Sequence, residues 1–182
     1  MQKLQKLATT DGLTKLYNSR SFYSQLELEI DRSNRYNHPL ALLLLDIDHF
    51  KDYNDSYGHL EGDKVLVHFS RVIKTCLRAN DSAYRYGGEE FALLLPDTDL
   101  DQCLQIAERI REHVAQLAEG GTLAVERLTV SIGAATSGGA SDLRPGDRLD
   151  LGNITLQVDG GAMSTDLYLD QTNIREGLSV SF

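Results

Sequence analysis

The sequence contains no tryptophan, only two cysteines and three prolines, and no long apolar run. A membrane-spanning helix needs about 18 consecutive apolar residues, and residues 1–6 lack the apolar core of a signal peptide. The chain is therefore expected to be soluble, with no membrane contact in this segment. Cys76 and Cys103 lie on the apolar faces of helical patterns, where a free thiol behaves as a small hydrophobe, so we expect a protein of the reducing cytoplasm.

Positive charge is also scarce and scattered. The chain has 18 Lys and Arg residues against 27 Asp and Glu residues, a formal net charge of -9, and its cations stand singly rather than in runs. Binding to DNA or RNA requires clustered cations that neutralise phosphates, so no nucleic-acid partner is expected. An acidic protein still binds a polyphosphate when a divalent cation bridges its carboxylates to the phosphate oxygens, and this combination fits a nucleotide enzyme.

The hydrophobic pattern predicts one α+β domain. Apolar residues at helical spacing predict three helices, over residues 19–36 and 62–78 and from Leu100 to Leu117, the last with Asp99 as its N-cap. A continuous apolar run over residues 40–45 indicates a buried strand, and alternation indicates another over 127–135. Residues 11–18 read as polar and turn-forming, and residues 49–54 as a polar segment. The loop-rich C-terminal stretch contains one candidate strand, 154–158.

A hairpin is predicted where Tyr84-Arg-Tyr-Gly87-Gly88-Glu89-Glu90 leads into the apolar strand Phe91 to Leu95. Paired positive φ angles are favourable only for Gly, and a backbone without Cβ also lets a phosphate approach closely. The order strand, helix, hairpin, helix, strand predicts a ferredoxin-like palm, a central mixed β-sheet flanked by helices with the hairpin at one edge.

Acidic residues follow two of the predicted strands. Asp46 and Asp48 end the buried run, and Glu89 and Glu90 stand at the hairpin tip. If these strands are neighbours, like charges at ~4 Å cost on the order of a few kcal/mol even when screened, so a cation is needed. Mg²⁺ favours a few carboxylates plus substrate phosphates, and two such ions clamp an in-line displacement at phosphorus. The alternative is two unrelated polar strand ends.

These motifs, in this order and spacing, resemble a known family. Asp46-Ile-Asp-His-Phe-Lys51, Asn54, Gly58-His59 with Gly62-Asp63, and Arg85-Tyr-Gly-Gly-Glu-Glu-Phe91 are similar to the GGDEF family of diguanylate cyclases, in its Gly-Gly-Glu-Glu-Phe form. The similarity extends from about residue 11 to 135. It implies an enzyme that converts two GTP into cyclic di-GMP and two pyrophosphates, with Mg²⁺ (or Mn²⁺) as cofactor and one GTP on each protomer of a homodimer.

The resemblance also implies roles for individual residues. The implied metal ligands are Asp46, the Ile47 carbonyl, Glu89 and Glu90, and the implied catalytic groups are Glu89, Glu90 and Lys51. Phosphate binding falls to the His49, Phe50 and Lys51 turn and to Arg175, and guanine binding to Asn54, His59 and Asp63. A carboxylate can accept from both N1–H and the N2 amine of guanine, which suits GTP over ATP, although a helix N-cap is an alternative role for Asp63.

Arg78-Ala-Asn-Asp81 resembles the family's product-inhibition motif, in which Arg pairs with phosphate or the guanine edge and Asp binds the guanine. Arg109, on the outer face of the third predicted helix, is a candidate secondary arginine supplied by a partner protomer. Residues 1–10 resemble the end of an upstream signalling helix, so a sensory or receiver module is expected before the cyclase domain of residues 11–182.

The sequence departs from the family in two places. Lys15 stands where the family usually has Gly, and residues 135–182 are atypical because Gln171 replaces a lysine and Ile174 a glycine in the last helix expected, residues 162–175. The altered tail favours a rival hypothesis, a catalytically weak or silent receptor for cyclic di-GMP that uses Arg78 and Asp81. A cyclase for another purine nucleotide is a third hypothesis, which Asp63 disfavours.

Overall fold

The computed structural model describes residues 9–119, 128–137, 148–150 and 155–157. Five strands form the central sheet in the order β1-β3-β4-β2-β5, with β1 parallel to β3 and every other neighbouring pair antiparallel. The strands are β1 (Tyr17–Asn18), β2 (Leu40–Ile47), β3 (Ser82–Arg85), β4 (Glu90–Pro96) and β5 (Val130–Ser137). The predicted palm, a mixed sheet with a hairpin formed by β3 and β4, is confirmed.

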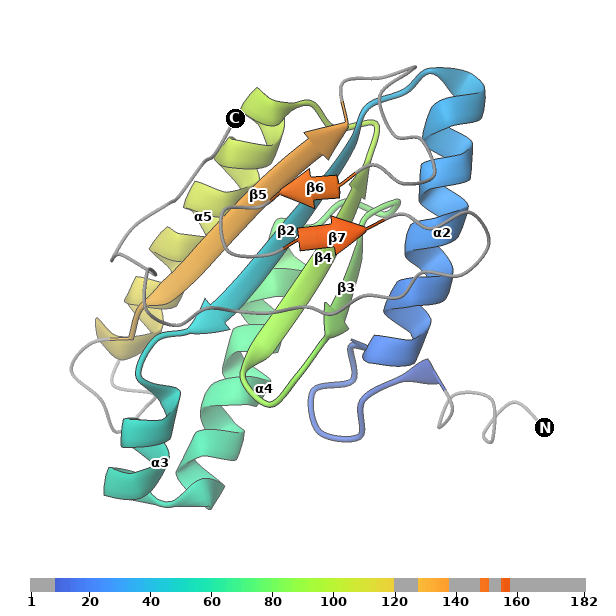
Figure 1. Cartoon of the computed structure of the whole chain (residues 1–182). Coiled ribbons are helices and arrows are strands. Elements are labelled where there is room, and N and C mark those ends of the chain that lie inside the picture. The colour runs from blue at the N-terminus through green and yellow to red at the C-terminus, as the bar shows by residue number, and fades with distance from the viewer. Residues whose placement is uncertain (1–8, 120–127, 138–147, 151–154, 158–182) are drawn as a thin grey trace.

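Helices cover both faces of this sheet. Helices α4 (His59–Cys76) and α5 (Leu100–Glu119) lie on one face, while α2 (Ser19–Tyr36) lies on the other, and the short α3 (Phe50–Tyr57) packs beside α4 (Figure 1). A separate two-stranded ribbon is formed by β6 (Arg148–Asp150) and β7 (Thr155–Gln157), the second of which falls inside the strand predicted over 154–158. No helix among the described residues is apolar over a membrane-spanning length.

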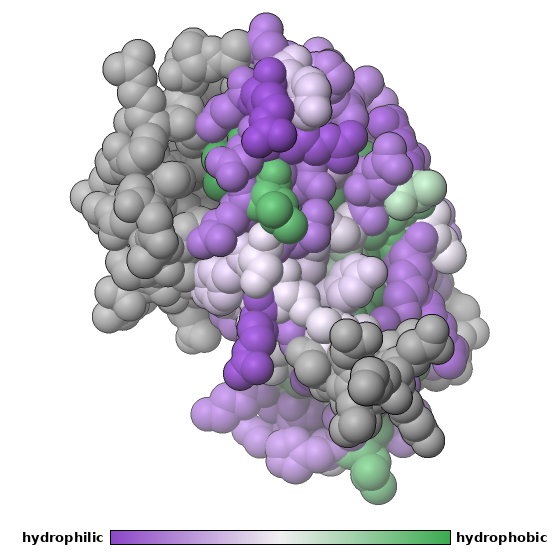
Figure 2. Space-filling model, turned by 90° about the vertical axis from the view of Figure 1, so that its right-hand side faces the viewer, coloured by the Kyte–Doolittle hydropathy of each residue, from purple (hydrophilic) through white to green (hydrophobic). Residues whose placement is uncertain are grey.

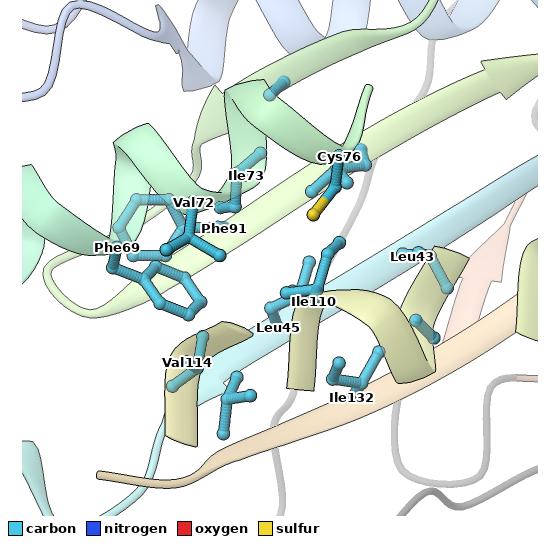
Figure 3. Close-up of a cluster of buried hydrophobic side chains, with 14 of the residues drawn as sticks. Leu43, Leu45, Phe69, Val72, Ile73, Cys76, Phe91, Ile110, Val114 and Ile132 are labelled. Carbon is cyan, nitrogen blue, oxygen red and sulfur yellow. The ribbon is translucent and has the colours of Figure 1, made fainter. Parts of the chain in front are cut away.

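A hydrophobic core lies on each face of the sheet, because successive side chains of a strand point to opposite faces. On β2 the odd residues Leu43 and Leu45 pack with Phe69 of α4 and Ile110 of α5, and Figure 3 shows these side chains filling the space between the sheet and the two helices. The even residues, such as Leu42 and Leu44, pack under α2 instead. Because β2 is buried on both faces, its sequence reads as a continuous apolar run.

Two helices begin where the sequence predicts, and a side chain caps each of them. The first predicted helix, 19–36, matches α2, whose N-cap Asn18 accepts a hydrogen bond from the Ser21 N–H through Oδ1 at 3.0 Å. Asp99 caps α5 reciprocally: the Gln102 N–H donates to Asp99 Oδ1 at 2.9 Å, and the Asp99 N–H donates to Gln102 Oε1 at 3.3 Å. The outer face of α2 is mostly hydrophilic (Figure 2), although Leu28 and Tyr36 are exposed on this helix.

The polar segment predicted over residues 49–54 contains the start of α3, a helix over residues 50–57 that the sequence did not predict. Only Phe50 and Tyr53 are buried on this helix, so its amphipathic signal is a single pair at i, i+3 in an otherwise polar stretch. The helix predicted from residue 62 begins instead at His59, after Gly58 with φ 87°. Asp63 therefore lies inside α4, which excludes the helix N-cap as its role.

The predicted reason for the glycine pair of the hairpin is also wrong. Gly58 is the positive-φ glycine of the described chain, so neither Gly87 nor Gly88 uses the left-handed region. Gly87 instead makes room for Glu90, since a Cβ there would lie 2.0 Å from the carboxylate oxygen Oε2 and would displace the end of that side chain. Gly88 has open space where its Cβ would be, so its backbone is accessible to a ligand.

Lys15 occupies a strained position in the turn before β1. Its backbone φ is 60°, in the left-handed region that residues other than Gly adopt at a cost of about 1–2 kcal/mol. The turn is held by Asp11, whose Oδ1 accepts hydrogen bonds from the Thr14 N–H and from Thr14 Oγ1, each at 2.7 Å. The family's glycine at this position therefore has a conformational reason.

We expect Lys15→Gly to raise the free energy of unfolding by about 1 kcal/mol, because the removed strain exceeds the added chain entropy of glycine. Urea denaturation of the wild type, Lys15→Gly and Lys15→Ala measures this effect. Lys15→Ala removes the same lysine side chain, including its bond to the Gly12 carbonyl, but keeps the strain. A glycine variant no more stable than the alanine variant would show that the backbone is not strained there.

Candidate active site

Asp46 lies at the centre of an acidic sheet edge. On β2 it is the register partner of Glu90 on β4 and of Ser131 on β5, so it is flanked on both sides. The backbone N–H of Ile47 donates to the Glu89 carbonyl at 3.4 Å, which continues the pairing of the two strands up to the hairpin tip. The acidic end of β2 and the acidic hairpin tip before the apolar part of β4 are therefore neighbours in space.

The crowding of carboxylates disturbs their protonation. Burial, together with the nearby carboxylates of Glu89, Glu90 and Asp48, raises the pKa of Asp46 from 3.8 to about 7. Burial likewise raises the pKa of Glu89, and burial and Glu89 raise that of Glu90. A cation at this edge would relieve the repulsion and favour the ionised form of all of these groups.

An open cleft of about 620 Å³ begins at this edge and extends along α3. It is lined by Asp46, Asp48, His49, Phe50, Lys51, Asp52, Asn54, Asp55, His59, Glu89 and Ser131. Most of the residues that the sequence singled out for metal, phosphate and guanine therefore share one cavity. Glu90 and Asp63 do not line it: Glu90 folds over Gly87, and Asp63 is exposed on α4.

Asn54 of α3 is packed against α4 at the far end of the cleft. A Cβ on Gly62 would lie 1.8 Å from Asn54 Oδ1, so only glycine allows the two helices to meet at this distance. Asn54 Oδ1 is buried and has no hydrogen-bond partner among the described residues. A buried acceptor without a partner is costly, so a ligand that donates a hydrogen bond there would stabilise the site.

The phosphate-binding candidates lie where β2 turns into α3. His49 adopts φ 57° as the N-cap of α3, and its carbonyl accepts the first helical hydrogen bond, from the Tyr53 N–H, at 3.0 Å. The first amides of a helix lack intrahelical acceptors and attract anions. Lys51, exposed in this first turn, adds a formal positive charge to the cleft.

Two residues outside the predicted site set shape the acidic edge. Arg85 donates from Nη2 to the Gly88 carbonyl at 2.7 Å and from Nη1 to Asp11 Oδ1 at 3.3 Å, so it fastens the hairpin loop to the turn before β1. Ser131 Oγ donates to Asp48 Oδ1 at 2.6 Å. The alternation over residues 127–135 puts Ser131 on the other face of β5 from Val130 and Ile132. This pattern was the signal available in the sequence for its position. The bond between Arg85 and Asp11 joins distant parts of the chain and had no local signal.

The Arg78–Asp81 turn lies at the other end of α4, about 25 Å along the helix from His59. Asp81 Oδ2 accepts the Arg78 N–H at 2.7 Å, and burial raises the pKa of Asp81, while Arg78 and Arg109 act against that rise. Arg109 of α5 also donates to the Cys76 carbonyl. Arg109 thus interacts electrostatically with Asp81 of its own chain, and its predicted contact with a partner protomer stays a prediction.

Some predicted site residues cannot be placed. Arg175, with Gln171, Ile174 and the whole last helix predicted over 162–175, lies outside the described residues. Within the described part of the chain, no three His, Cys, Asp or Glu side chains form a ready-made metal cage.

The fold and the acidic edge define a palm domain of the nucleotidyl cyclase type. Residues 8–149 match the family described as diguanylate cyclase, GGDEF domain. The chain belongs to this GGDEF family, as its resemblance indicated.

Named relatives agree with this assignment. The response regulator PleD of Caulobacter vibrioides is 43% identical over 141 residues, which are 75% of this chain and 31% of PleD. The coiled coil and GGDEF domain of DgcB from Caulobacter crescentus, solved with c-di-GMP, gives a TM-score of 0.69 at 34% identity and covers 75% of this chain and 73% of that one. The active GGEEF domain of a diguanylate cyclase from Vibrio cholerae gives 0.62 at 27% identity, with 71% and 78% covered. The chain spans about a third of the length of PleD.

Proposed function

We propose that this domain is a diguanylate cyclase that condenses two GTP into cyclic di-GMP and two pyrophosphates. The observation that supports it most is the position of Asp46, crowded by three further carboxylates at the mouth of a nucleotide-sized cleft. In each half of the reaction a 3′-hydroxyl oxygen attacks the α-phosphorus of the other GTP, the bond to pyrophosphate breaks, and the hydroxyl proton passes to a base. Glu89, which lines the cleft, is the candidate base, and Glu90 assists it.

The metal ligands proposed for this reaction are Asp46, the Ile47 carbonyl and the two hairpin glutamates. Mg²⁺, or Mn²⁺, would neutralise the triphosphate and stabilise the departing pyrophosphate when bound. The raised pKa of Asp46 supports this proposal, because a carboxyl group that ionises poorly in the free protein gains most from a cation.

Other residues of the chain are proposed to bind the phosphates and the guanine base of GTP. Lys51 and the amides of residues 49–51 would bind the phosphates through charge and through an anion nest at the start of α3. Asn54, with its buried acceptor, and His59 would bind guanine in the cleft, and Asp63, exposed on α4 outside its lining, would reach the guanine edge from beside it. Arg175 is proposed to add a charge-assisted hydrogen bond to the triphosphate.

One domain has a single acidic edge of this kind among its described residues, so each protomer is proposed to hold one GTP and the reaction to require two protomers face to face. The Arg78–Asp81 turn, with Arg109 beside it, is proposed to bind cyclic di-GMP and inhibit turnover. The module that would bring two domains together is proposed to precede this chain.

A comparison of GTP with ATP tests the proposed substrate. We expect the wild type to convert GTP with a much higher kcat/KM than ATP, and Asp63→Ala to reduce this preference about 10- to 100-fold, the scale of one bidentate base contact. Asp101→Ala, which removes an exposed helical carboxylate of α5, is the matched control. Unchanged discrimination in Asp63→Ala would exclude Asp63 from guanine binding.

A further inference from the structure

A cluster of aromatic rings lies between α2 and the hairpin. Phe22 of α2 is fully buried and contacts Tyr84 and Tyr86 edge to face, with ring centroids 5.3 Å and 5.6 Å apart. Tyr23, the next residue on α2, contacts Tyr86 at 5.9 Å. The cluster is apolar in its interior, and its polar atoms are the tyrosine hydroxyls at its margin.

The two tyrosine hydroxyls at the hairpin end of this cluster bond to each other. Tyr23 Oη and Tyr86 Oη form a hydrogen bond that joins α2 to the first residue of the loop. Tyr84, one pleat further from the tip, uses its hydroxyl differently and donates to Ser82 Oγ at 2.8 Å. One tyrosine pair is therefore tied to the tip of the hairpin, while an otherwise similar tyrosine is tied to its base.

Tyr86 in turn is connected to the hairpin glutamates. The N–H groups of Tyr86 and Gly87 both donate to the Glu90 carbonyl, at 2.8 Å and 3.2 Å. The carboxylate of Glu90 lies against Gly87, at the position a Cβ would take. A shift of the Tyr86 ring would therefore move the backbone that supports Glu90. Because Glu90 is the register partner of Asp46, the spacing of these two residues would change as well.

The loop has two independent fastenings. Arg85 holds the carbonyls of Gly87 and Gly88 from one side and is itself fixed by Asp11. The bond between Tyr23 and Tyr86 holds the other side against α2. Because the loop closes with glycines and bears two carboxylates that repel Asp46, it would relax away from the sheet edge if either fastening were lost.

We propose that Tyr23 is a positioning residue for the cyclase reaction: its hydroxyl holds Tyr86, and Tyr86 holds the backbone that places Glu89 and Glu90 beside Asp46. The inference rests on the proposed function. Tyr23 does not bind substrate in this account. It acts on carboxylates that must stay in place while a cation and two phosphates are bound, and the loss of such supporting groups typically lowers activity about 10- to 100-fold.

The test compares three variants that each remove one hydroxyl and keep the ring. Tyr23→Phe and Tyr86→Phe are each expected to lower kcat about tenfold without changing KM for GTP, because the nucleotide is held by residues of α3 and α4. The double variant of Tyr23 and Tyr86 is expected to lose no more activity than either single variant, because each single variant already lacks the hydrogen bond between the two hydroxyls. Tyr84→Phe, the matched control, is expected to keep the wild-type kcat.

A second measurement does not depend on activity. Native-state hydrogen exchange of the Tyr86 and Gly87 amides, followed by NMR, reports whether the loop stays closed on the Glu90 carbonyl. We expect exchange about tenfold faster in Tyr23→Phe and Tyr86→Phe, and unchanged in Tyr84→Phe. If the wild type made no cyclic di-GMP, the proposed function would fail while the exchange rates still decided the positioning role.

Each result has a defined meaning. A lower kcat with faster exchange in the two tip variants alone supports the proposal. Wild-type exchange in Tyr23→Phe overturns it, because the hydroxyl would then not hold the loop. Faster exchange with a wild-type kcat also overturns it, because the reaction would then not depend on the position of the loop. Equal losses in Tyr84→Phe would overturn it too, by reducing the effect to general stability of the cluster.

Discussion

Asp46→Asn and Glu89→Gln are each expected to reduce cyclic di-GMP formation by about two to three orders of magnitude, the scale seen when one electrostatic stabiliser of a transition state is removed. Both substitutions keep size and hydrogen-bonding capacity but remove the charge that a cation requires. Initial rates with saturating GTP and Mg²⁺ measure the effect. Asp52→Asn, which neutralises an exposed carboxylate of the same cleft outside the acidic edge, is the matched control and is expected to keep most of its activity.

The Asp46→Asn substitution should leave the fold intact, which separates a chemical defect from unfolding. The pKa of Asp46 is about 7 in the folded state against 3.8 for the ordinary carboxyl, so the folded protein binds this proton more tightly than the unfolded chain does. The stability of the metal-free wild type therefore falls as pH rises from about 4 to about 7, and an amide at this position, which does not ionise, removes that penalty. At pH 8 we expect Asp46→Asn to resist urea at least as well as the wild type. An inactive variant that is also unfolded would leave Glu89→Gln to decide, and more than about a tenth of the wild-type rate in either folded variant would contradict the metal assignment.

Arg78→Ala is expected to weaken binding of cyclic di-GMP about 10- to 100-fold and to leave the initial rate with GTP unchanged. The arginine stands at the end of α4 remote from the cleft, and its loss removes charge-assisted contacts to phosphate or guanine. Isothermal titration calorimetry with cyclic di-GMP measures the affinity, and initial rates in the presence of added product measure the inhibition.

Two other arginines sharpen this experiment. Arg111→Ala removes an exposed arginine of α5 that pairs with Glu108, and it should keep the wild-type affinity. Arg109→Ala should weaken product binding but also lower stability, because Arg109 donates to the Cys76 carbonyl at the end of α4. Equal product affinity in Arg78→Ala and the wild type would remove the inhibitory site from the account.

The parts of the fold that the sequence predicts well are those with strong local signals. The apolar run that became β2, the period of α2 and the start of α5 at its cap Asp99 depend on neighbours a few residues apart. α3 was missed because a short helix with two buried residues has almost no period to detect. β1 was missed because its two residues become a strand only by pairing with Tyr84 and Arg85, far along the chain.

The candidate site shows the same difference between features with local sequence signals and features that depend on tertiary contacts. The acids, Lys51 and Asn54 stand in motifs whose residue types match the chemistry, and the sheet register brings most of them to one cleft. The groups that hold those motifs in place had no such signal. The bond of Arg85 to Asp11, the hydroxyl pair of Tyr23 and Tyr86, and the packing of Arg109 beside Asp81 are all tertiary contacts.

The central claim is that the acidic edge and its cleft make cyclic di-GMP from GTP. Its most direct test is incubation of the protein at high concentration with GTP and Mg²⁺, followed by chromatography and mass spectrometry of the nucleotides and a separate assay of pyrophosphate. We expect cyclic di-GMP with two pyrophosphates per molecule formed, a specific activity that rises with protein concentration, and about two to three orders of magnitude less product from Glu89→Gln. A folded wild-type protein that binds cyclic di-GMP but leaves GTP unchanged under these conditions would contradict it and identify the domain as a receptor.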